Sequence, residues 1–209
     1  IINQVLSVEE SERLTNIVFM GMGEPMDNFD AVLAAIEVLT EPWGLAWSPR
    51  RITVSTIGKL DTLRKLLDQT QVHVAVSVHS PFSSERAALM PVEKAYPLLD
   101  VLKLLKRYDF AHQRRLSVEY TVFRGVNDDM RHADALARLL RNMQCRVNLI
   151  RFHAIPGSEL KPVPESAMTA FRDRLNSHGI TATIRASRGE DIMAACGMLA
   201  GKNRQEGAS

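Results

Sequence analysis

Residues 16–25 read Asn-Ile-Val-Phe-Met-Gly-Met-Gly-Glu-Pro, an apolar run of strand length that ends in a glycine-rich turn. β-Branched and aromatic residues in so short a run are typical of a buried β-strand. The glycines at 21 and 23 allow the backbone to approach a ligand closely, and Glu24 adds a carboxylate beside them. This unit of strand and polar strand end repeats along the chain, and the repetition decides the predicted fold.

Strands and helices alternate through the sequence. The predicted strands are residues 16–21, 51–55, 73–79, 116–123, 147–153 and 181–185. The predicted helices are residues 30–39, 60–67, 98–108, 131–142, 167–178 and 191–199. One helix after each strand is the pattern of parallel βα units, so we expect an α/β fold with a parallel (β/α) barrel or part of one. No internal linker interrupts it, which predicts a single domain over residues 1–209.

Composition limits the class of protein. With 209 residues, 45% of them hydrophobic and 24% charged, the chain is not a disordered tail. It has no apolar run of the roughly 18–20 residues that a spanning helix needs and no secretion signal, so we expect a cytoplasmic protein with no membrane partner. The chain opens with Ile1 rather than Met, within an apparent helix, and we therefore expect it to be part of a longer polypeptide.

Charge is distributed unevenly along the chain. Residues 1–100 carry 8 basic and 13 acidic side chains, a net charge of −5, whereas residues 101–209 carry 18 and 11, a net charge of +7. A basic half is what a phosphate-rich partner such as RNA requires. An ordinary solvated basic face explains the same numbers, so composition permits RNA without selecting it.

Polar residues gather where the predicted strands end. Beyond Glu24 there are Ser55, the Ser77-Val78-His79 stretch and His153. In a parallel barrel the carboxyl ends of the strands form the active face, so these groups are expected to surround one polar small molecule that bears an amine and a ribose. Taken singly, each has a plainer explanation as a turn residue or a hydrogen-bonded structural histidine.

Two cysteines are present, Cys145 and Cys196, too few for a disulfide framework or for a metal cluster held by cysteine alone. Cys196 lies in an apolar stretch that follows Arg185 and Arg188. It is either a small buried side chain or a nucleophilic thiolate whose pKa is lowered by the nearby arginines.

The order of these motifs resembles the RlmN/Cfr family of radical S-adenosylmethionine RNA methyltransferases. The resemblance covers nearly the whole chain. The matching residues are Asn16 to Pro25, Ser55 to Gly58, Ser77 to His79, Glu119-Tyr120, Gly125 to Asp128, Asn148 to Ile150, Ser187 to Gly189 and Ala195 to Gly197.

The resemblance implies a partial radical SAM barrel whose strand ends bind S-adenosylmethionine. Gly23 and Glu24 would hold the methionyl amine, Ser55 the ribose region, and Ser77, Val78 and His79 further parts of the ligand; His153 stands where the family usually carries Asn. Cys196 matches the cysteine that first accepts a methyl group. A 5′-deoxyadenosyl radical then abstracts hydrogen from that S-methyl group, and the carbon radical adds to an adenine of 23S rRNA or tRNA, at C2 or, in some members, at C8.

The departures from the family pattern are equally specific. The CxxxCxxC loop that binds the family's [4Fe-4S] cluster is absent, as are the first barrel strand, the N-terminal RNA-binding domain, the upstream glutamate base and the resolving cysteine. Val92-Glu93-Lys94 stands where the family often has Ile-Asn-Lys, and Met198 replaces a common Gln. Cys145 matches no functional position and is interpreted as structural.

The hypothesis is therefore the cluster-lacking C-terminal part of such an RNA methyltransferase, inactive by itself, with RNA and an electron donor such as flavodoxin as partners of the full-length family. One alternative is a non-catalytic paralogue that binds S-adenosylmethionine or RNA on a degraded barrel. Another is an ordinary barrel enzyme acting on a phosphorylated metabolite, for which Glu24 and His79 are the available acid–base pair.

Overall fold

A computed structural model describes residues 1–20, 23–154 and 157–185. Its strands form one parallel sheet in sequential order, with β1 at one edge and β6 at the other. The strands are β1 (Ile17–Phe19), β2 (Ile52–Thr56), β3 (His73–Ser77), β4 (Leu116–Val122), β5 (Cys145–Arg151) and β6 (Ala182–Ile184). The predicted α/β class and parallel arrangement are confirmed. Within the described residues β1 and β6 do not pair, so the sheet is an open, partial barrel.

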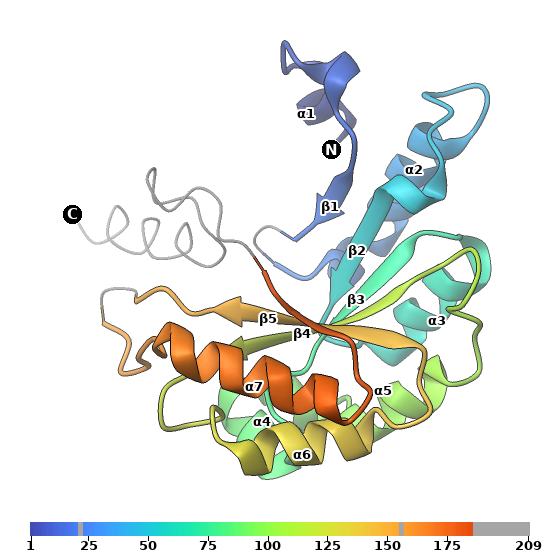
Figure 1. The fold of residues 1–209 in the computed structure, drawn as a ribbon. Coiled ribbons are helices and arrows are strands. Elements are labelled where there is room, and N and C mark those ends of the chain that lie inside the picture. Colours follow the sequence, from blue (N-terminus) through green and yellow to red (C-terminus); the bar gives the residue numbers. More distant parts are fainter. Residues whose placement is uncertain (21–22, 155–156, 186–209) are drawn as a thin grey trace.

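The α-helices that follow the strands lie on one side of this sheet, while the short helix before the first strand lies at the N-terminal end of the molecule (Figure 1). The α-helices are α1 (Ile2–Leu6), α2 (Phe29–Thr40), α3 (Leu60–Gln69), α4 (Ser83–Leu89), α5 (Leu98–Leu105), α6 (Met130–Leu139) and α7 (Glu165–Ser177). Sequential strand order explains the one-sided cover, because right-handed crossovers between parallel neighbours carry each connecting helix over the same face. Among residues 1–20, 23–154 and 157–185, no helix covers the opposite face of the sheet.

The two faces of the sheet differ in chemistry because side chains alternate along each strand. Val54, Val76, Val118 and Leu149 point beneath the helices and are fully buried in the hydrophobic core. The residues between them point the other way and are largely polar. One row crosses four strands in register; it consists of Ser77, Glu119, Asn148 and Thr183.

The predicted elements differ from the structure mainly at their ends. β5 begins at Cys145, two residues earlier than predicted, because its ladder with β4 already starts at the pair Leu116–Cys145. Helix α4 was not predicted, since its seven residues lie between prolines and show little apolar periodicity. The helix predicted for residues 191–199 lies outside the described residues, and the single-domain expectation stays a prediction.

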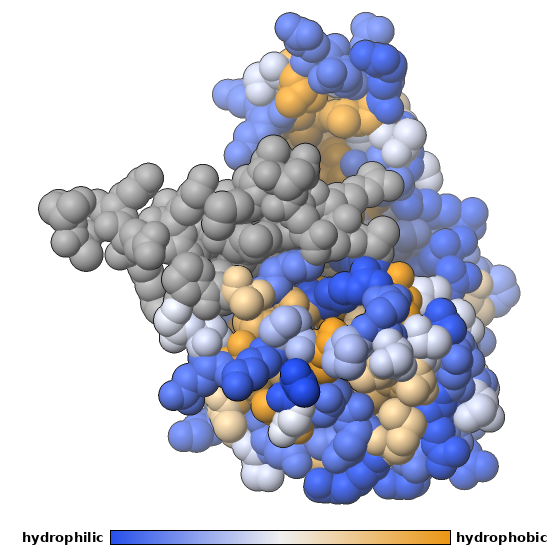
Figure 2. All heavy atoms as spheres, turned by 60° about the vertical axis from the view of Figure 1, so that its left-hand side comes forward, coloured by the Kyte–Doolittle hydropathy of each residue, from blue (hydrophilic) through white to orange (hydrophobic). Residues whose placement is uncertain are grey.

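The end of the molecule formed by α1 exposes apolar side chains among charged ones (Figure 2). Ile1, Leu6 and Val8 are exposed there. In the ranges that the structure describes, every helix is too short or too polar to cross a bilayer.

Candidate ligand-binding site

A cavity of about 190 Å³ opens at the carboxyl ends of the strands. Its walls are Phe19, Met20, Gly23, Glu24, Pro25, Ser55, Thr56, Ile57, Ser77, His79, Glu119, Thr121, Ile150 and Arg185. Five residues singled out from the sequence, Gly23, Glu24, Ser55, Ser77 and His79, thus meet in one place. Strands β1, β2 and β3 bring them together because all three end at the same edge of the sheet.

Glu24 is anchored by backbone amides of two different segments. Its Oε1 accepts a hydrogen bond from the amide of Met26 (3.2 Å), in the short 3₁₀ turn that follows β1. Its Oε2 accepts one from the amide of Ile57 (2.8 Å), just beyond β2. A carboxylate has about four acceptor positions, so two fixed bonds orient the group and leave capacity for a cationic ligand group.

Glycines shape the backbone beside this carboxylate. Gly23 has φ +83° and Gly58 has φ +98°, both in the left-handed region that side chains disfavour. A Cβ on Gly58 would lie 2.7 Å from a methyl carbon of Val101 in α5. Gly58 is therefore required both for the turn after β2 and for the close packing of α5 below the cavity.

His79 is held in an unusual backbone conformation, with φ +58°. Its Nδ1 accepts a hydrogen bond from the amide of Thr121 (3.0 Å), so the ring hydrogen of the neutral form resides on Nε2. Burial, reinforced by the charge of Arg86, lowers the pKa of His79 to about 4. The imidazole is thus neutral at physiological pH and a weak base, which disfavours His79 as the base in the alternative Glu24–His79 pair.

A buried amide supports the conformation of His79. The Nδ2 of Asn127 donates to the carbonyl of His79 (2.6 Å) and to that of Thr121 (2.8 Å), while its Oδ1 accepts from the amide of Phe123 (2.7 Å). Asn127 is fully buried. Sequence reasoning recorded it only as a motif residue, because a lone Asn in a loop carries no sign of such a network.

Arg86 in α4 fixes the ends of β2 and β3 from below. The side chain is fully buried and donates to the carbonyls of Ile57 (3.2 Å), Ser77 (3.1 Å) and Val78 (3.2 Å). It also pairs with Glu93, which is 5% exposed. Glu93 does not line the cavity; it neutralises Arg86 and so supports the site indirectly. The sequence offered no signal for this pair, since charged residues are ordinarily exposed.

Two further lining residues, Glu119 and Arg185, were missed as site residues. Glu119 projects from the middle of β4, and Arg185 follows β6. The Nη1 of Arg185 lies 3.7 Å from Oε2 of Glu119 and 3.0 Å from Sδ of Met20, which follows β1. Arg185, which follows the last strand, therefore contacts Met20 next to the first strand and lies near Glu119 of β4 at the cavity wall.

The remaining predicted site residues lie elsewhere. Val78 is fully buried and absent from the cavity wall, and His153 follows β5 outside the lining set. Cys196 lies outside the described residues. Cys145, at the start of β5, is half-buried, and burial raises the pKa of its thiol to about 11, which fits a structural thiol.

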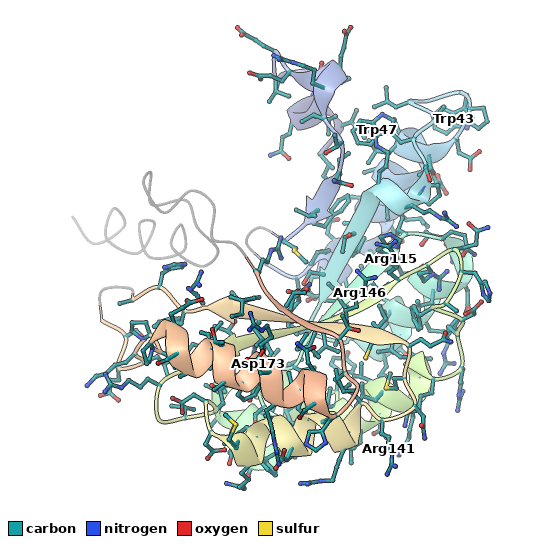
Figure 3. The ribbon with its side chains drawn as sticks, viewed as in Figure 1. Trp43, Trp47, Arg115, Arg141, Arg146 and Asp173 are labelled. Atoms are coloured by element: carbon teal, nitrogen blue, oxygen red, sulfur yellow. The ribbon has the colours of Figure 1, made fainter. Side chains whose placement is uncertain are left out.

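The amino end of the polar face is basic. Arg115 immediately precedes β4 and Arg146 lies near the start of β5 (Figure 3). Both side chains are exposed. Burial and the charges of Arg115 and Arg50 lower the pKa of the neighbouring His73. Part of the excess positive charge of residues 101–209 thus lies on this face.

The chain matches the family model of the Radical SAM superfamily over residues 1–137. The chain belongs to this superfamily. Among the described residues, no group of three or more His, Cys, Asp or Glu side chains could hold a metal ion. The part of this radical SAM chain that the structure describes thus contains the wall of a ligand cavity and no such group of metal ligands.

Curated relatives are closely similar over nearly the whole chain. It is 60% identical over 199 residues to the "Probable dual-specificity RNA methyltransferase RlmN" of Porphyromonas gingivalis strain W83, covering 95% of this chain and 58% of that protein. It is 53% identical over 206 residues to the protein of the same name from Bacteroides fragilis, covering 60% of it. The chain thus spans less than two thirds of these relatives, and the resemblance predicted from the motifs is confirmed.

Solved structures agree with this placement. A crystal structure of a radical SAM methyltransferase from Sphaerobacter thermophilus superposes with a TM-score of 0.89 at 39% identity, over 94% of this chain and 60% of that one. A domain of pyruvate-formate lyase-activating enzyme from Bacteroides vulgatus superposes with a TM-score of 0.62 at 17% identity, which shows the common fold alone.

Proposed function

We propose that this radical SAM chain forms the S-adenosylmethionine-binding part of an RNA methyltransferase that methylates an adenine base. The observation that carries the proposal is the meeting of Gly23, Glu24, Ser55, Ser77 and His79 around one cavity. The RNA methyltransferase names of relatives that are 53–60% identical support the reaction class.

The cavity has groups that suit S-adenosylmethionine, which supplies a methyl group when it is bound. Glu24, oriented by two amides, accepts hydrogen bonds from the methionyl ammonium. Ser55 and Ser77 offer hydroxyls on neighbouring strands, and the neutral ring of His79 offers an Nε2–H donor. Val78 is proposed as a positioning residue, since its side chain is buried and its carbonyl is held by Arg86. His153, which follows β5, is proposed to contact the ligand beyond the described cavity wall.

Cys196 is proposed as the residue that carries the methyl group. The target is an adenine of 23S rRNA, and of tRNA as a second substrate, with methylation at C2 and C8 as the alternative position. Residues 1–209 contain two cysteines, fewer than the three thiolates that a radical SAM [4Fe-4S] cluster takes. We therefore infer that these residues do not hold the cluster and have no methyltransferase activity alone. A cytoplasmic location and a flavodoxin-type electron donor stay predictions.

The test compares three variants of the full-length protein, purified anaerobically. Cys196→Ala is expected to abolish methylation of RNA adenine, read by mass spectrometry of nucleosides, while leaving the affinity for S-adenosylhomocysteine unchanged. Glu24→Gln is expected to weaken that affinity by about ten- to a hundredfold, because it removes one charge-assisted hydrogen bond. Glu37→Gln, on the exposed side of α2, is the matched control and should change neither quantity.

The same measurements separate the proposed enzyme from a binding paralogue. Tight binding of S-adenosylhomocysteine by the wild type, with no methylation of any RNA adenine, would support the non-catalytic alternative. Unchanged methylation in Cys196→Ala would contradict the methyl-carrying role.

A further inference from the structure

Glu119 is a carboxylate buried within the cavity wall. It lies in the middle of β4, in register with Ser77 on β3 and Asn148 on β5, and it is 2% exposed. Isolated buried carboxylates are costly, and they are retained where a partner compensates for the lost water. The partners of the two carboxylate oxygens therefore indicate what Glu119 does.

One oxygen is fully accounted for within the sheet. Oε1 accepts hydrogen bonds from Oγ of Ser117 (3.0 Å) and from Nδ2 of Asn148 (2.8 Å). Asn148 is held in turn by the hydroxyl of Thr183, which lies 3.3 Å from its Oδ1. These contacts come from β4, β5 and β6, and they fix the orientation of the carboxyl group.

The other oxygen, Oε2, is buried and has no hydrogen-bond partner among the described residues. The Nη1 of Arg185 lies 3.7 Å away, beyond hydrogen-bond distance, and contacts Met20 instead. Burial raises the pKa of Glu119, while Asn148, Ser117 and the charge of Arg185 oppose that rise. Glu119 lines the ligand cavity, so a donor on a bound ligand would complete this acceptor.

We propose that Oε2 of Glu119 accepts a hydrogen bond from a ribose hydroxyl of the bound S-adenosyl ligand. Glu119 is then a specificity residue for the sugar. This inference rests on the function proposed above. The ligand offers three kinds of donor: an ammonium, the 2′- and 3′-hydroxyls, and the adenine 6-amino group.

The surroundings of Oε2 favour the hydroxyls. The ammonium is taken by Glu24 across the cavity, and a ribose hydroxyl paired with a buried acidic side chain is the arrangement used in dinucleotide-binding folds. One row nearer the rim, the same face carries Ile150, an apolar side chain that suits the flat adenine ring. The row of Ser77, Glu119 and Asn148 is polar throughout, as a sugar requires.

The experiment measures the binding of S-adenosylhomocysteine and of its 2′-deoxy and 3′-deoxy analogues to the full-length protein by calorimetry. The wild type should bind at least one deoxy analogue about ten- to a hundredfold more weakly, the range expected for a lost hydrogen bond to a buried charged group. S-inosylhomocysteine, which lacks the 6-amino group, reports on the adenine donor and should not share the dependence on Glu119.

Two substitutions carry the test. Glu119→Leu removes both acceptors and should erase the discrimination against the deoxy analogue. Glu119→Gln keeps the shape of the side chain, so it remains informative if the leucine variant does not fold. Its carbonyl oxygen should occupy the Oε1 position, which receives two donors, and its NH₂ group would face the cavity in place of an acceptor. Discrimination should fall in this variant also.

Glu37→Gln is the matched control, because it makes the same change from carboxylate to amide on the exposed side of α2, outside the cavity wall. It should retain the discrimination. If the wild type binds both deoxy analogues as tightly as the parent, or if Glu119→Gln alters only the response to S-inosylhomocysteine, the assignment to the ribose is overturned. If the wild type does not bind S-adenosylhomocysteine at all, the proposed function itself fails.

Discussion

The two faces of the sheet are made by the same strands but have different roles: one packs against the helices in the hydrophobic core, and the other lines the ligand cavity. On β5, Leu149 is fully buried under the helices, whereas its neighbour Ile150 lines the ligand cavity. On β4, Val118 and Tyr120 belong to the core, and Glu119 between them faces the cavity. Alternate residues of one strand thus contribute to the stability of the fold and to ligand binding. Substitutions at neighbouring positions should therefore affect one property without the other.

The largest expected effect on stability concerns Arg86, a fully buried charged residue below the ends of β2 and β3. Replacing it in Arg86→Met leaves Glu93 buried without a cation and removes the guanidinium donor from three carbonyls. We expect a loss of about 3–5 kcal/mol in the free energy of unfolding, measured by urea denaturation. The double variant Arg86→Met with Glu93→Leu should recover part of that loss. A single variant as stable as the wild type would show that the strand ends do not depend on this pair.

The contrast itself is tested on two neighbours of β5. Leu149→Ala should reduce the free energy of unfolding by about 2–5 kcal/mol, because it opens a cavity in the packed core. Ile150→Ala should cost clearly less stability and instead weaken the binding of S-adenosylhomocysteine. Equal losses of stability in the two variants would contradict the division of tasks between the faces.

A smaller effect on stability is expected at His132 of α6, whose ring lies between two carboxylates. Its Nδ1 is 2.7 Å from Asp129 and its Nε2 is 2.7 Å from Glu85, which also accepts from Ser80 (2.9 Å). Burial is the largest single influence and raises the pKa of Glu85 and of Asp129, but the hydrogen bonds that each accepts and the nearby charges of His132 and Arg131 together outweigh it and lower both pKa values.

Lowered carboxyl pKa values stabilise the fold above the ordinary values of 4.5 and 3.8, and this contribution is lost as the pH falls through the lowered values. His132→Phe should therefore lower the thermal midpoint near neutral pH by about 2–4 °C and flatten its decline in acid. Ser80→Ala, which removes one bond to Glu85, should produce a smaller part of the change. Circular dichroism melts between about pH 7 and pH 3 measure both. If the thermal midpoints of His132→Phe and wild type fall in parallel as the pH is lowered, the carboxylates paired with His132 do not contribute to the pH dependence of stability.

The smallest effect concerns Glu119, whose burial on the polar face of the sheet reduces the stability of the fold. Because burial raises the pKa of Glu119, its ionised form destabilises the fold above the ordinary value of 4.5. Glu119→Gln should therefore gain stability relative to the wild type as the pH rises past 4.5, by about 2 °C in thermal midpoint. The same variant should lose ligand discrimination, so stability and recognition would change in opposite directions. A gain that is independent of pH would point to a cause other than ionisation.

Much of this architecture was predictable from local pattern. Runs of β-branched residues located every strand of the described sheet, and the rule for parallel barrels placed Ser55, Ser77 and His79 at one edge. What could not be predicted depends on contacts between distant residues. Arg86 and Glu93 are charged residues that only tertiary packing brings under the strands, and Val78 follows the alternation of β3 into the core. Glu119 was visible as a motif residue, but its orphaned oxygen follows from the register of three strands.

The position of Glu119 between Val118 and Tyr120 also favours the correct alignment of β4 with its neighbouring strands. Parallel strands of valine and leucine offer several nearly equivalent alignments, and a slip by one residue reverses the direction of every side chain. In β4 such a slip would drive the carboxylate beneath the helices and turn Tyr120 out into the cavity. The misaligned sheet would bury an uncompensated charge, a penalty of several kcal/mol. The residue proposed to bind the ribose would therefore also disfavour the misaligned register of β4.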